Sequence, residues 1–253
     1  MCYNHDAVPP SPPVGQLPYA ATDLVLRASD GTEFAAFEAV PQSPASSRIL
    51  LLPDIGGLSD FYRRLGGYLA GVGYRTLVID WFGRTAGPAL RTGGLDHDEW
   101  QFALTREELL IDVQTGLDNL VGNGPLVAMG FCIGGGTALH AAAQGLAIDS
   151  VVAFYPFTGG WVGVPALPDD FVAAIDCPVL GLFGAADEAV PVAKAHAFRT
   201  LLAPPSEVVI YDGEPHGYFE KDFRAEGGHE EASVDSWSRL LAFLGGSGGP
   251  KTR

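Results

Sequence analysis

The amino-acid sequence predicts a single α/β domain, in which helices cover both faces of a mostly parallel sheet. Three observations support this fold class. Short, nearly continuous apolar runs recur along the chain, as expected for strands that are buried on both faces. Helix-compatible segments lie between these runs, so strands and helices alternate. The chain has 253 residues, a length that can bury one large core.

The predicted elements begin with an antiparallel hairpin at the edge of the sheet. Residues 23–28 and 33–40 are strand-like, and the segment between them contains the turn pair Asp30-Gly31. Parallel strands are expected in six apolar runs, which are residues 48–53, 75–80, 125–129, 149–154, 177–183 and 207–211. Helices are expected between these runs and after the last of them, at residues 59–72, 105–121, 136–144, 192–202 and 230–244.

Proline- and glycine-rich stretches set the limits of the domain. We expect a proline-rich lead over residues 1–22, the domain over residues 23–244 and a flexible tail over residues 245–253. Two longer connections, residues 81–97 and 155–176, follow strands and are rich in glycine, proline and aromatic residues. Ligands bind at the carboxyl edge of open parallel sheets, so these connections should form the walls of an open pocket.

The charge of the chain restricts its partners. It has 30 acidic and 15 basic residues and a net charge of −15, which repels nucleic acid and anionic membranes. No apolar run is long enough to cross a bilayer and no secretory signal is visible, so a cytoplasmic protein without membrane or nucleic-acid partners is expected. A small molecule is the expected partner, and a monomer is slightly favoured.

The cysteines indicate a reducing compartment, because three are too few and too odd in number for a disulfide framework. Cys2 lies in the lead, and Cys177 opens an apolar run, where it is expected to be a small core residue. No Cys-x-x-Cys or His-x-x-x-His spacing suggests zinc. We therefore expect neither a metal nor a cofactor.

Cys132 lies in the most informative motif, Gly130-Phe131-Cys132-Ile133-Gly134-Gly135, between an apolar run and a helix-compatible segment. This context predicts a sharp strand-to-helix turn that holds the Cys132 side chain out of the top of the sheet. Glycines are expected on both sides because a larger neighbour would collide with the turn. A thiol is a candidate nucleophile, and it requires a base or a positive field to hold the thiolate.

Asp187 and His216 follow Cys132 in the chain order nucleophile, acid, histidine that is expected of an α/β-hydrolase. Each lies just beyond a strand-like run, so all three should meet at the carboxyl edge of the sheet. His216 would act as base and then as acid, and Asp187 would orient its ring. Asp176 and Asp212 are alternative carboxylates, and the competing interpretation is a buried cysteine on a glycine-rich turn.

Two backbone amides are candidates for an oxyanion hole. One belongs to Ile133, directly after the candidate nucleophile, and the other to Ile55, in a loop whose glycines permit close approach to a ligand. The aromatic residues Trp81 and Tyr155 stand at strand ends, where they either line the substrate pocket or close the core.

The sequence resembles the dienelactone hydrolase family over nearly its whole length. The resemblance rests on the motif around Cys132, on Asp187-Glu188-Ala189-Val190-Pro191 and on Pro215-His216-Gly217. The segment Pro-Asp-Ile-Gly-Gly is similar to the one that carries the family's acidic group beside the resting thiol, and Asp-Trp-Phe-Gly-Arg to the one that carries its substrate-binding arginine. The resemblance implies that Asp54 contacts the thiol, that Arg84 binds a substrate carboxylate, and that the chain hydrolyses dienelactones or related small esters.

Two positions depart from the family pattern. The family has a glutamate where this chain has Asp54, which is one methylene shorter. A second carboxylate-binding arginine of the family is Glu220 here, and Lys221 or Arg224 are the candidates to replace it. The substrate is therefore either an anionic lactone, which is slightly favoured, or a neutral ester. A hydrolase of thioesters or amides and a non-catalytic ligand-binding protein of the same fold remain as alternatives.

Overall fold

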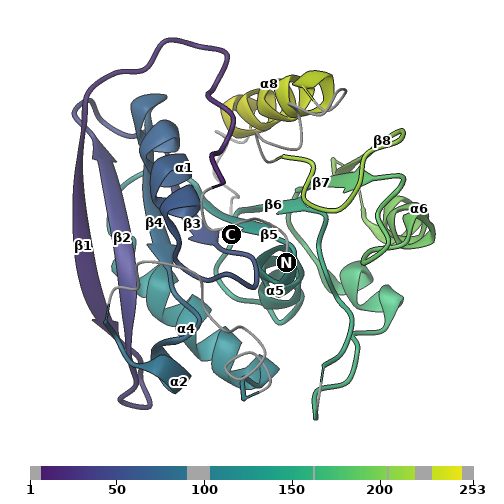
Figure 1. Cartoon of the computed structure of the whole chain (residues 1–253), viewed down its shortest axis with the longest axis horizontal. Helices are drawn as coiled ribbons and strands as arrows, with labels where there is room; N and C mark the ends of the chain where they lie inside the picture. The colour runs from purple at the N-terminus through teal and green to yellow at the C-terminus, as the bar shows by residue number, and fades with distance from the viewer. Residues whose placement is uncertain (1–6, 90–102, 162, 204, 220–229, 247–253) are drawn as a thin grey trace.

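The computed structural model describes residues 7–89, 103–161, 163–203, 205–219 and 230–246. In this part of the chain, a single sheet of eight strands forms the centre of the molecule (Figure 1). The strands are β1 (Tyr19–Arg27), β2 (Glu33–Pro41), β3 (Ser47–Leu52), β4 (Tyr74–Ile79), β5 (Leu126–Phe131), β6 (Ser150–Phe154), β7 (Val179–Gly184) and β8 (Glu207–Tyr211).

The order of strands across the sheet is β1-β2-β4-β3-β5-β6-β7-β8. β1 and β2 form an antiparallel hairpin, β2 is antiparallel to β4, and all other neighbouring pairs are parallel. Because β4 lies on one side of β3 and β5 on the other, the sheet has a topological switch point at the carboxyl ends of β3 and β5. Ligands bind at such points in open α/β sheets.

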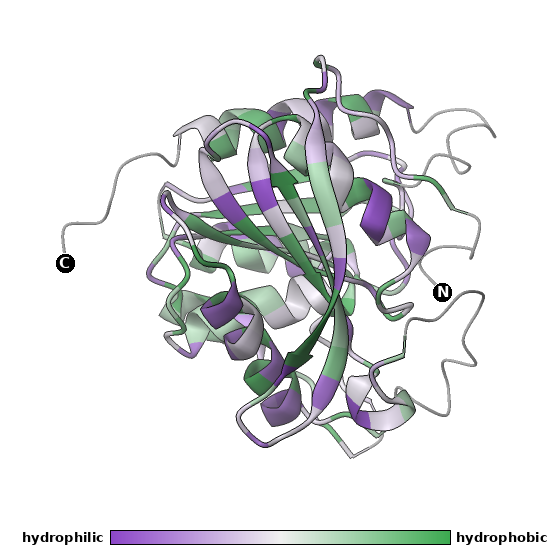
Figure 2. Cartoon of the chain, turned by 90° about the vertical axis from the view of Figure 1, so that its left-hand side faces the viewer, coloured by the Kyte–Doolittle hydropathy of each residue, from purple (hydrophilic) through white to green (hydrophobic). Residues whose placement is uncertain are grey.

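Helices cover both faces of the twisted sheet, whose central strands are strongly hydrophobic (Figure 2). The helices are α1 (Asp60–Gly71), α2 (Gly83–Ala86), α4 (Arg106–Asn119), α5 (Ile133–Ala143), α6 (Val192–Leu201) and α8 (Glu230–Gly246). One core lies under α1 and α8, and the other lies under α4, α5 and α6. None of the described helices is long and apolar enough to cross a membrane.

Strand residues alternate between these two cores. Leu50 and Leu52 of β3 belong to the core under α4 and α5, whereas Ile49 and Leu51 belong to the core under α1 and α8, and all four are fully buried. A strand that is buried on both faces must be apolar throughout, which explains the continuous apolar runs. The predicted fold class is confirmed.

The observed elements follow the predicted ones closely. The turn between β1 and β2 contains Gly31 at φ 90°, a conformation that favours glycine. α2 and a short 3₁₀ helix (Asp169–Ala174) lie within segments predicted to be irregular connections. Both are too short for a helical repeat of apolar residues to reveal them in the sequence.

The amino-terminal boundary differs from the prediction. β1 begins at Tyr19, inside the expected lead, because it pairs with β2 along its whole length. Earlier residues also pack on the domain, since Ala7 and Pro10 are buried. The indole N–H of Trp237 in α8 donates a hydrogen bond of 3.0 Å to the backbone oxygen of Pro10. The proline-rich segment is therefore part of the packed structure.

Candidate active site

Cys132 lies on the sharp turn between β5 and α5, with backbone angles of φ 50° and ψ −118°. Non-glycine residues rarely adopt positive φ, and such a conformation stores strain. A Cβ atom on Gly130 would lie 2.2 Å from the carbonyl oxygen of Gly134, and one on Gly134 would lie 2.2 Å from the carbonyl oxygen of Pro53. Both distances are too short for a side chain, so the predicted need for glycine on either side of Cys132 is confirmed.

The close approach of Gly134 to Pro53 brings the two predicted oxyanion segments together. Ile133 is the first residue of α5, and the N–H groups of the first helical turn have no acceptor within the helix. Ile55 lies two residues after Pro53, in the loop that follows β3. Both segments therefore meet at the topological switch point of the sheet.

The loop after β3 is fixed by several hydrogen bonds. The backbone N–H of Asp54 donates to the hydroxyl of Tyr62 at 2.9 Å, and Oδ1 of Asp54 accepts from the N–H of Gly56 at 2.8 Å. The indole N–H of Trp81 donates to the backbone oxygens of Pro53 and Asp54, both at 3.1 Å. Asp54 thus stabilises its own turn, and its contact with the Cys132 thiol stays a prediction.

His216 and Asp187 form a hydrogen-bonded pair beyond β7 and β8. Nδ1 of His216 lies 2.7 Å from Oδ2 of Asp187. The other oxygen of Asp187 accepts hydrogen bonds from the N–H groups of Ala189 at 2.8 Å and Val190 at 2.7 Å. The Asp187 side chain is 1% exposed, so its carboxylate is held in one position and can fix the orientation of the imidazole ring.

Backbone contacts join the loops that carry this pair. The N–H of Ala185 donates to the carbonyl of Tyr211 at 2.8 Å, and the N–H of Ala186 donates to the carbonyl of Glu214 at 2.9 Å. A Cβ atom on Gly184 would lie 2.2 Å from the same oxygen of Glu214. A glycine at the end of β7 therefore lets the two loops approach closely.

His216 also hydrogen-bonds the side chain of Cys132. Burial lowers the pKa of His216, but hydrogen bonds to Asp187 and Cys132, together with their negative charges, outweigh burial and raise its pKa from 6.5 to about 10. These neighbours therefore favour the charged form of the ring. The structure brings Cys132, His216 and Asp187 together in one hydrogen-bonded chain.

Comparison with known proteins identifies the family of this chain. Residues 34–247 match the family model described as the dienelactone hydrolase family. The chain belongs to the dienelactone hydrolase family. It is 29% identical over 255 residues to the carboxymethylenebutenolidase of Rhodococcus opacus, with 96% of each chain covered. The predicted family is thereby confirmed, and the protein is a hydrolase.

Solved structures resemble most of the chain. A Klebsiella pneumoniae protein assigned to the dienelactone hydrolases has a TM-score of 0.73 and 25% identity, and the match covers 89% of this chain and 99% of that one. A dienelactone hydrolase-like promiscuous phosphotriesterase from metagenomic libraries has a TM-score of 0.70 and 20% identity, with 91% of this chain and 100% of that one covered. The second likeness supports the fold alone.

Arg84 has fixed partners in this member of the dienelactone hydrolase family. Its Nε and Nη2 donate to the two carboxylate oxygens of Asp112 at 3.0 and 2.7 Å. Its Nη1 donates to Oδ2 of Asp30 at 2.5 Å and to Oγ1 of Thr32 at 3.2 Å. The guanidinium of Arg84 is already hydrogen-bonded to two carboxylates of this chain. The predicted contact of Arg84 with a substrate carboxylate is therefore not supported. Glu220, at the position of the second family arginine, lies outside the described residues.

The two carboxylates around Arg84 differ in environment. The Asp112 side chain is fully buried, and burial raises its pKa to about 6 although Arg84 opposes this rise. Asp30 is exposed, and the hydrogen bond from Arg84 lowers its pKa to about 2. Both are ionised at neutral pH. The sequence offered one signal of this cluster, because Asp112 stands next to the apolar residues of α4, where a charge requires a partner.

Trp81 and Tyr155 do not occupy the open positions predicted for substrate-binding residues. Trp81 is 2% exposed and supports the loop after β3 through its indole N–H. Tyr155 is fully buried, and its ring packs on the ring of His216. Both large rings lie in the core at strand ends, which is the second of the two alternatives that the sequence left open. Trp81 therefore contacts the loop after β3, and Tyr155 contacts His216.

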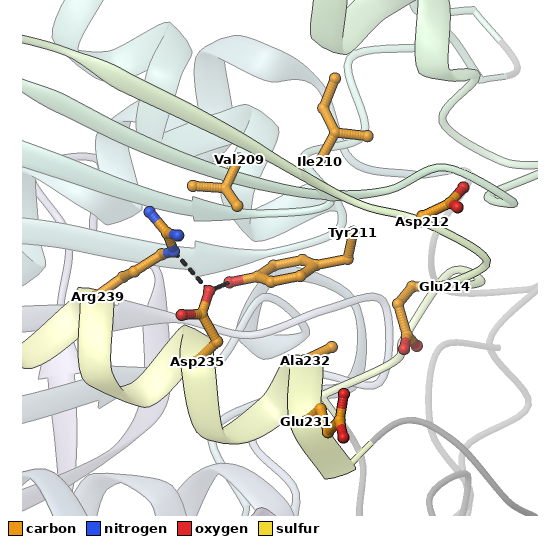
Figure 3. Close-up of a pocket in the computed structure, with 9 residues that line it drawn as sticks. All are labelled: Val209, Ile210, Tyr211, Asp212, Glu214, Glu231, Ala232, Asp235 and Arg239. Carbon is orange, nitrogen blue, oxygen red and sulfur yellow. Dashed lines mark hydrogen bonds and ion pairs between the residues drawn. The ribbon is translucent and has the colours of Figure 1, made fainter.

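A separate hollow of about 450 Å³ lies between β8 and α8 (Figure 3). It is lined by Val209, Ile210, Tyr211, Asp212, Glu214, Glu231, Ala232, Asp235 and Arg239. The hydroxyl of Tyr211 donates to Oδ2 of Asp235 at 2.9 Å, and Nε of Arg239 donates to the same oxygen at 2.5 Å. The hollow lacks Cys132 and His216, and no group of three or more metal-ligating side chains lies together in the described part of the chain.

Proposed function

We propose that this protein is a cysteine-dependent hydrolase of small esters or lactones. In this proposal Cys132 is the nucleophile, His216 transfers protons and Asp187 orients the ring of His216. The observation that carries the proposal is the hydrogen-bonded chain of these three side chains at a strained strand-to-helix turn. An adjacent imidazolium stabilises a thiolate, which is the reactive form of cysteine.

Acylation begins from the thiolate and the imidazolium. The sulfur of Cys132 attacks the carbonyl carbon, and the amides of Ile133 and Ile55 stabilise the negative charge on the carbonyl oxygen. The bond to the leaving alcohol or enol then breaks, and His216 supplies the proton that the leaving oxygen takes up. His216 acts as an acid in this first half-reaction, because its raised pKa of about 10 keeps it protonated at rest.

Deacylation returns the enzyme to its starting state. The neutral ring of His216 accepts a proton from water while the water oxygen attacks the thioester carbonyl. The carbon–sulfur bond breaks, the carboxylic acid is released, and Cys132 leaves as a thiolate beside the regenerated imidazolium. Asp187 holds the ring and stabilises its positive charge in both half-reactions.

We propose that the preferred substrate is neutral. The guanidinium of Arg84 is neutralised by Asp112 and Asp30. Asp54 and Asp187 add buried carboxyl groups at the strand ends, and the chain carries a net charge of −15. Negative charge around a cleft repels an anionic substrate and leaves a neutral ester or lactone unaffected.

The nucleophile can be tested by trapping the acyl-enzyme with a short activated ester such as p-nitrophenyl acetate. Peptide mass spectrometry should find the acetyl group on Cys132, and the buried Cys177 serves as the control within the same chain. Asp187→Asn should slow the formation of the adduct. An acetyl group on another residue, or burst formation that persists in Cys132→Ala, would contradict the proposal.

The charge of the substrate can be tested with a lactone carboxylic acid and its methyl ester. Wild-type enzyme should show the higher kcat/KM with the methyl ester, and the difference should shrink when salt screens the surface charge. A preference for the free acid that disappears in Arg84→Gln would instead restore a carboxylate-binding role to Arg84. A panel that adds a thioester and an amide separates this function from the other acyl hydrolases.

A further inference from the structure

Tyr155 shares an unusual backbone conformation with Cys132. They are the two non-glycine residues with positive φ in the described part of the chain, at 33° and 50°. They also occupy matching positions, because Phe131 of β5 pairs with Phe154 of β6 and each strained residue comes next. Residues hold such conformations where the surrounding contacts impose them, most often at functional sites.

The backbone at both positions is fixed by the neighbouring strand. The N–H of Cys132 donates to the carbonyl of Phe154 at 3.0 Å, and the N–H of Tyr155 donates to the carbonyl of Leu182 at 2.7 Å. The carbonyl of Cys132 in turn accepts from the N–H of Phe157 at 2.8 Å. The chain after β6 is thus joined directly to the turn that carries the thiol.

The Tyr155 ring lies between this turn and the loop of the histidine. Its centroid is 4.9 Å from that of the His216 ring, with an angle of 63° between the planes, which is an edge-to-face contact. It also packs on Phe131, before the turn, at 6.0 Å and on Tyr218, after the histidine, at 5.6 Å. A fully buried ring with these neighbours has little room to move.

Tyr218 gives the Tyr155 ring a firm support. Its hydroxyl lies 3.0 Å from Oγ of Ser236 in α8, and that oxygen donates to the hydroxyl of Tyr211 at 3.1 Å. The loop that carries His216 is therefore held on α8 through Tyr218. It packs on the Cys132 turn through the ring of Tyr155.

We infer that Tyr155 is a positioning residue that holds the imidazole of His216 in the orientation in which it bonds both Asp187 and Cys132. The inference rests on the proposed function, because it assigns a task within the same reaction. An imidazole without this contact can turn about its side-chain bonds and lose one of the two hydrogen bonds. A misplacement of about 1 Å in a catalytic group lowers turnover up to roughly a hundredfold.

Three variants test this role. Tyr155→Leu removes the ring and Tyr155→Phe keeps it. Phe154→Leu is the control for loss of a neighbouring buried ring, because Phe154 is also fully buried and packs on Phe131 at 4.4 Å and on Tyr155 at 6.2 Å. With a neutral activated ester, kcat should fall about tenfold or more in Tyr155→Leu, with KM within about twofold of wild type. Tyr155→Phe and Phe154→Leu should keep most of the wild-type kcat. Tyr155→Met serves in place of Tyr155→Leu if the latter does not fold.

The pH dependence of Cys132 alkylation is a measurement that general damage to the core does not change. Iodoacetamide should label Cys132 rapidly below the ordinary thiol pKa of about 8.5 in wild type, Tyr155→Phe and Phe154→Leu. In Tyr155→Leu the profile should shift to higher pH, because the imidazolium no longer faces the sulfur.

Wild-type kcat and an unshifted profile in Tyr155→Leu would overturn the inference. Equal losses in Tyr155→Leu and Phe154→Leu, or in Tyr155→Leu and Tyr155→Phe, would overturn it as well, since the ring contact would then not be the cause. Failure of the proposed function has a different result, namely full ester hydrolysis by Cys132→Ala, which the Tyr155 variants cannot produce.

Discussion

Two groups of charged side chains in the described part of the chain differ in what their partners leave available for chemistry. In one group, Arg84 is bonded by the buried Asp112 of α4 and by Asp30 in the exposed β1–β2 turn. In the other, His216 is bonded on one side by Asp187 and on the other by the thiol of Cys132, which sits on a strained turn. Burial and charge alone do not distinguish the ion pairs of Arg84 from the proposed catalytic site; the thiol on strained backbone does.

The direction of the pKa shifts makes the same distinction. The partners of His216 raise its pKa to about 10 in spite of burial, so the site stabilises a charged ring. Burial raises the pKa of Asp112 to about 6 in spite of its partner Arg84, because removing the carboxylate from water costs free energy. The surroundings of His216 favour a charged intermediate, whereas the ion pairs of Arg84 connect α2, α4 and the β1–β2 turn.

The largest expected effect is the loss of the nucleophile. Cys132→Ala should lower kcat/KM for a neutral ester more than roughly a thousandfold, because the turn accepts a small side chain and only the thiol is lost. Cys177→Ala, which changes a buried cysteine in the core, is the control and should remain active. Turnover should be compared at equal folded fraction, judged by circular dichroism. Retention of more than a tenth of wild-type activity in Cys132→Ala would remove Cys132 from the mechanism.

Substitution of the orienting carboxylate should have the next largest effect. Asp187→Asn should lower kcat by about a hundredfold or more, and His216→Ala should be worse, because a misoriented imidazole still transfers some protons. Asp212→Asn is the control, since Asp212 was the alternative carboxylate in the sequence. If Asp212→Asn is inactive and Asp187→Asn is not, the two assignments must be exchanged.

Arg84→Met should affect stability and spare catalysis. It leaves the buried carboxylate of Asp112 without its cation, which should lower the free energy of unfolding by about 3–5 kcal/mol. The control Arg239→Met removes two exposed ion pairs, with Glu207 and Asp235, and should change the free energy of unfolding by about 1 kcal/mol or less. Adding Asp112→Leu to Arg84→Met should recover much of the loss. Urea unfolding measures the stabilities, and a loss in Arg84→Met no larger than in Arg239→Met would contradict the structural role.

The pH dependence should show the smallest effect. His216 is protonated in the folded enzyme up to about pH 10, so any step that uses it as an acid is available below that pH and is lost as the pH rises through about 10. Alkylation of Cys132 should already be fast at pH 7, and in His216→Gln it should follow an ordinary thiol with a pKa of about 8.5. Identical alkylation profiles in the two proteins would show that His216 does not stabilise the thiolate.

The sequence predicted the fold well because parallel strands buried on both faces leave continuous apolar runs, as in β3 and β5. It also predicted which residues meet at the candidate site, because Cys132, Asp187 and His216 each follow such a run. The partners of Arg84 could not be predicted in the same way. Asp112 and Asp30 lie 28 and 54 residues from it, and only the packing of α4 and of the β1–β2 turn brings them close.

The hydrogen bond between Trp237 and Pro10 has a consequence for synthesis of the chain. It joins residues 227 positions apart, so it cannot form until the last helix has left the ribosome. The same helix carries Ser236, which anchors Tyr218 beside the histidine. A nascent chain that lacks α8 can build most of the sheet, yet its histidine loop lacks the support of Ser236, and hydrolytic activity should appear only after α8 has been synthesised.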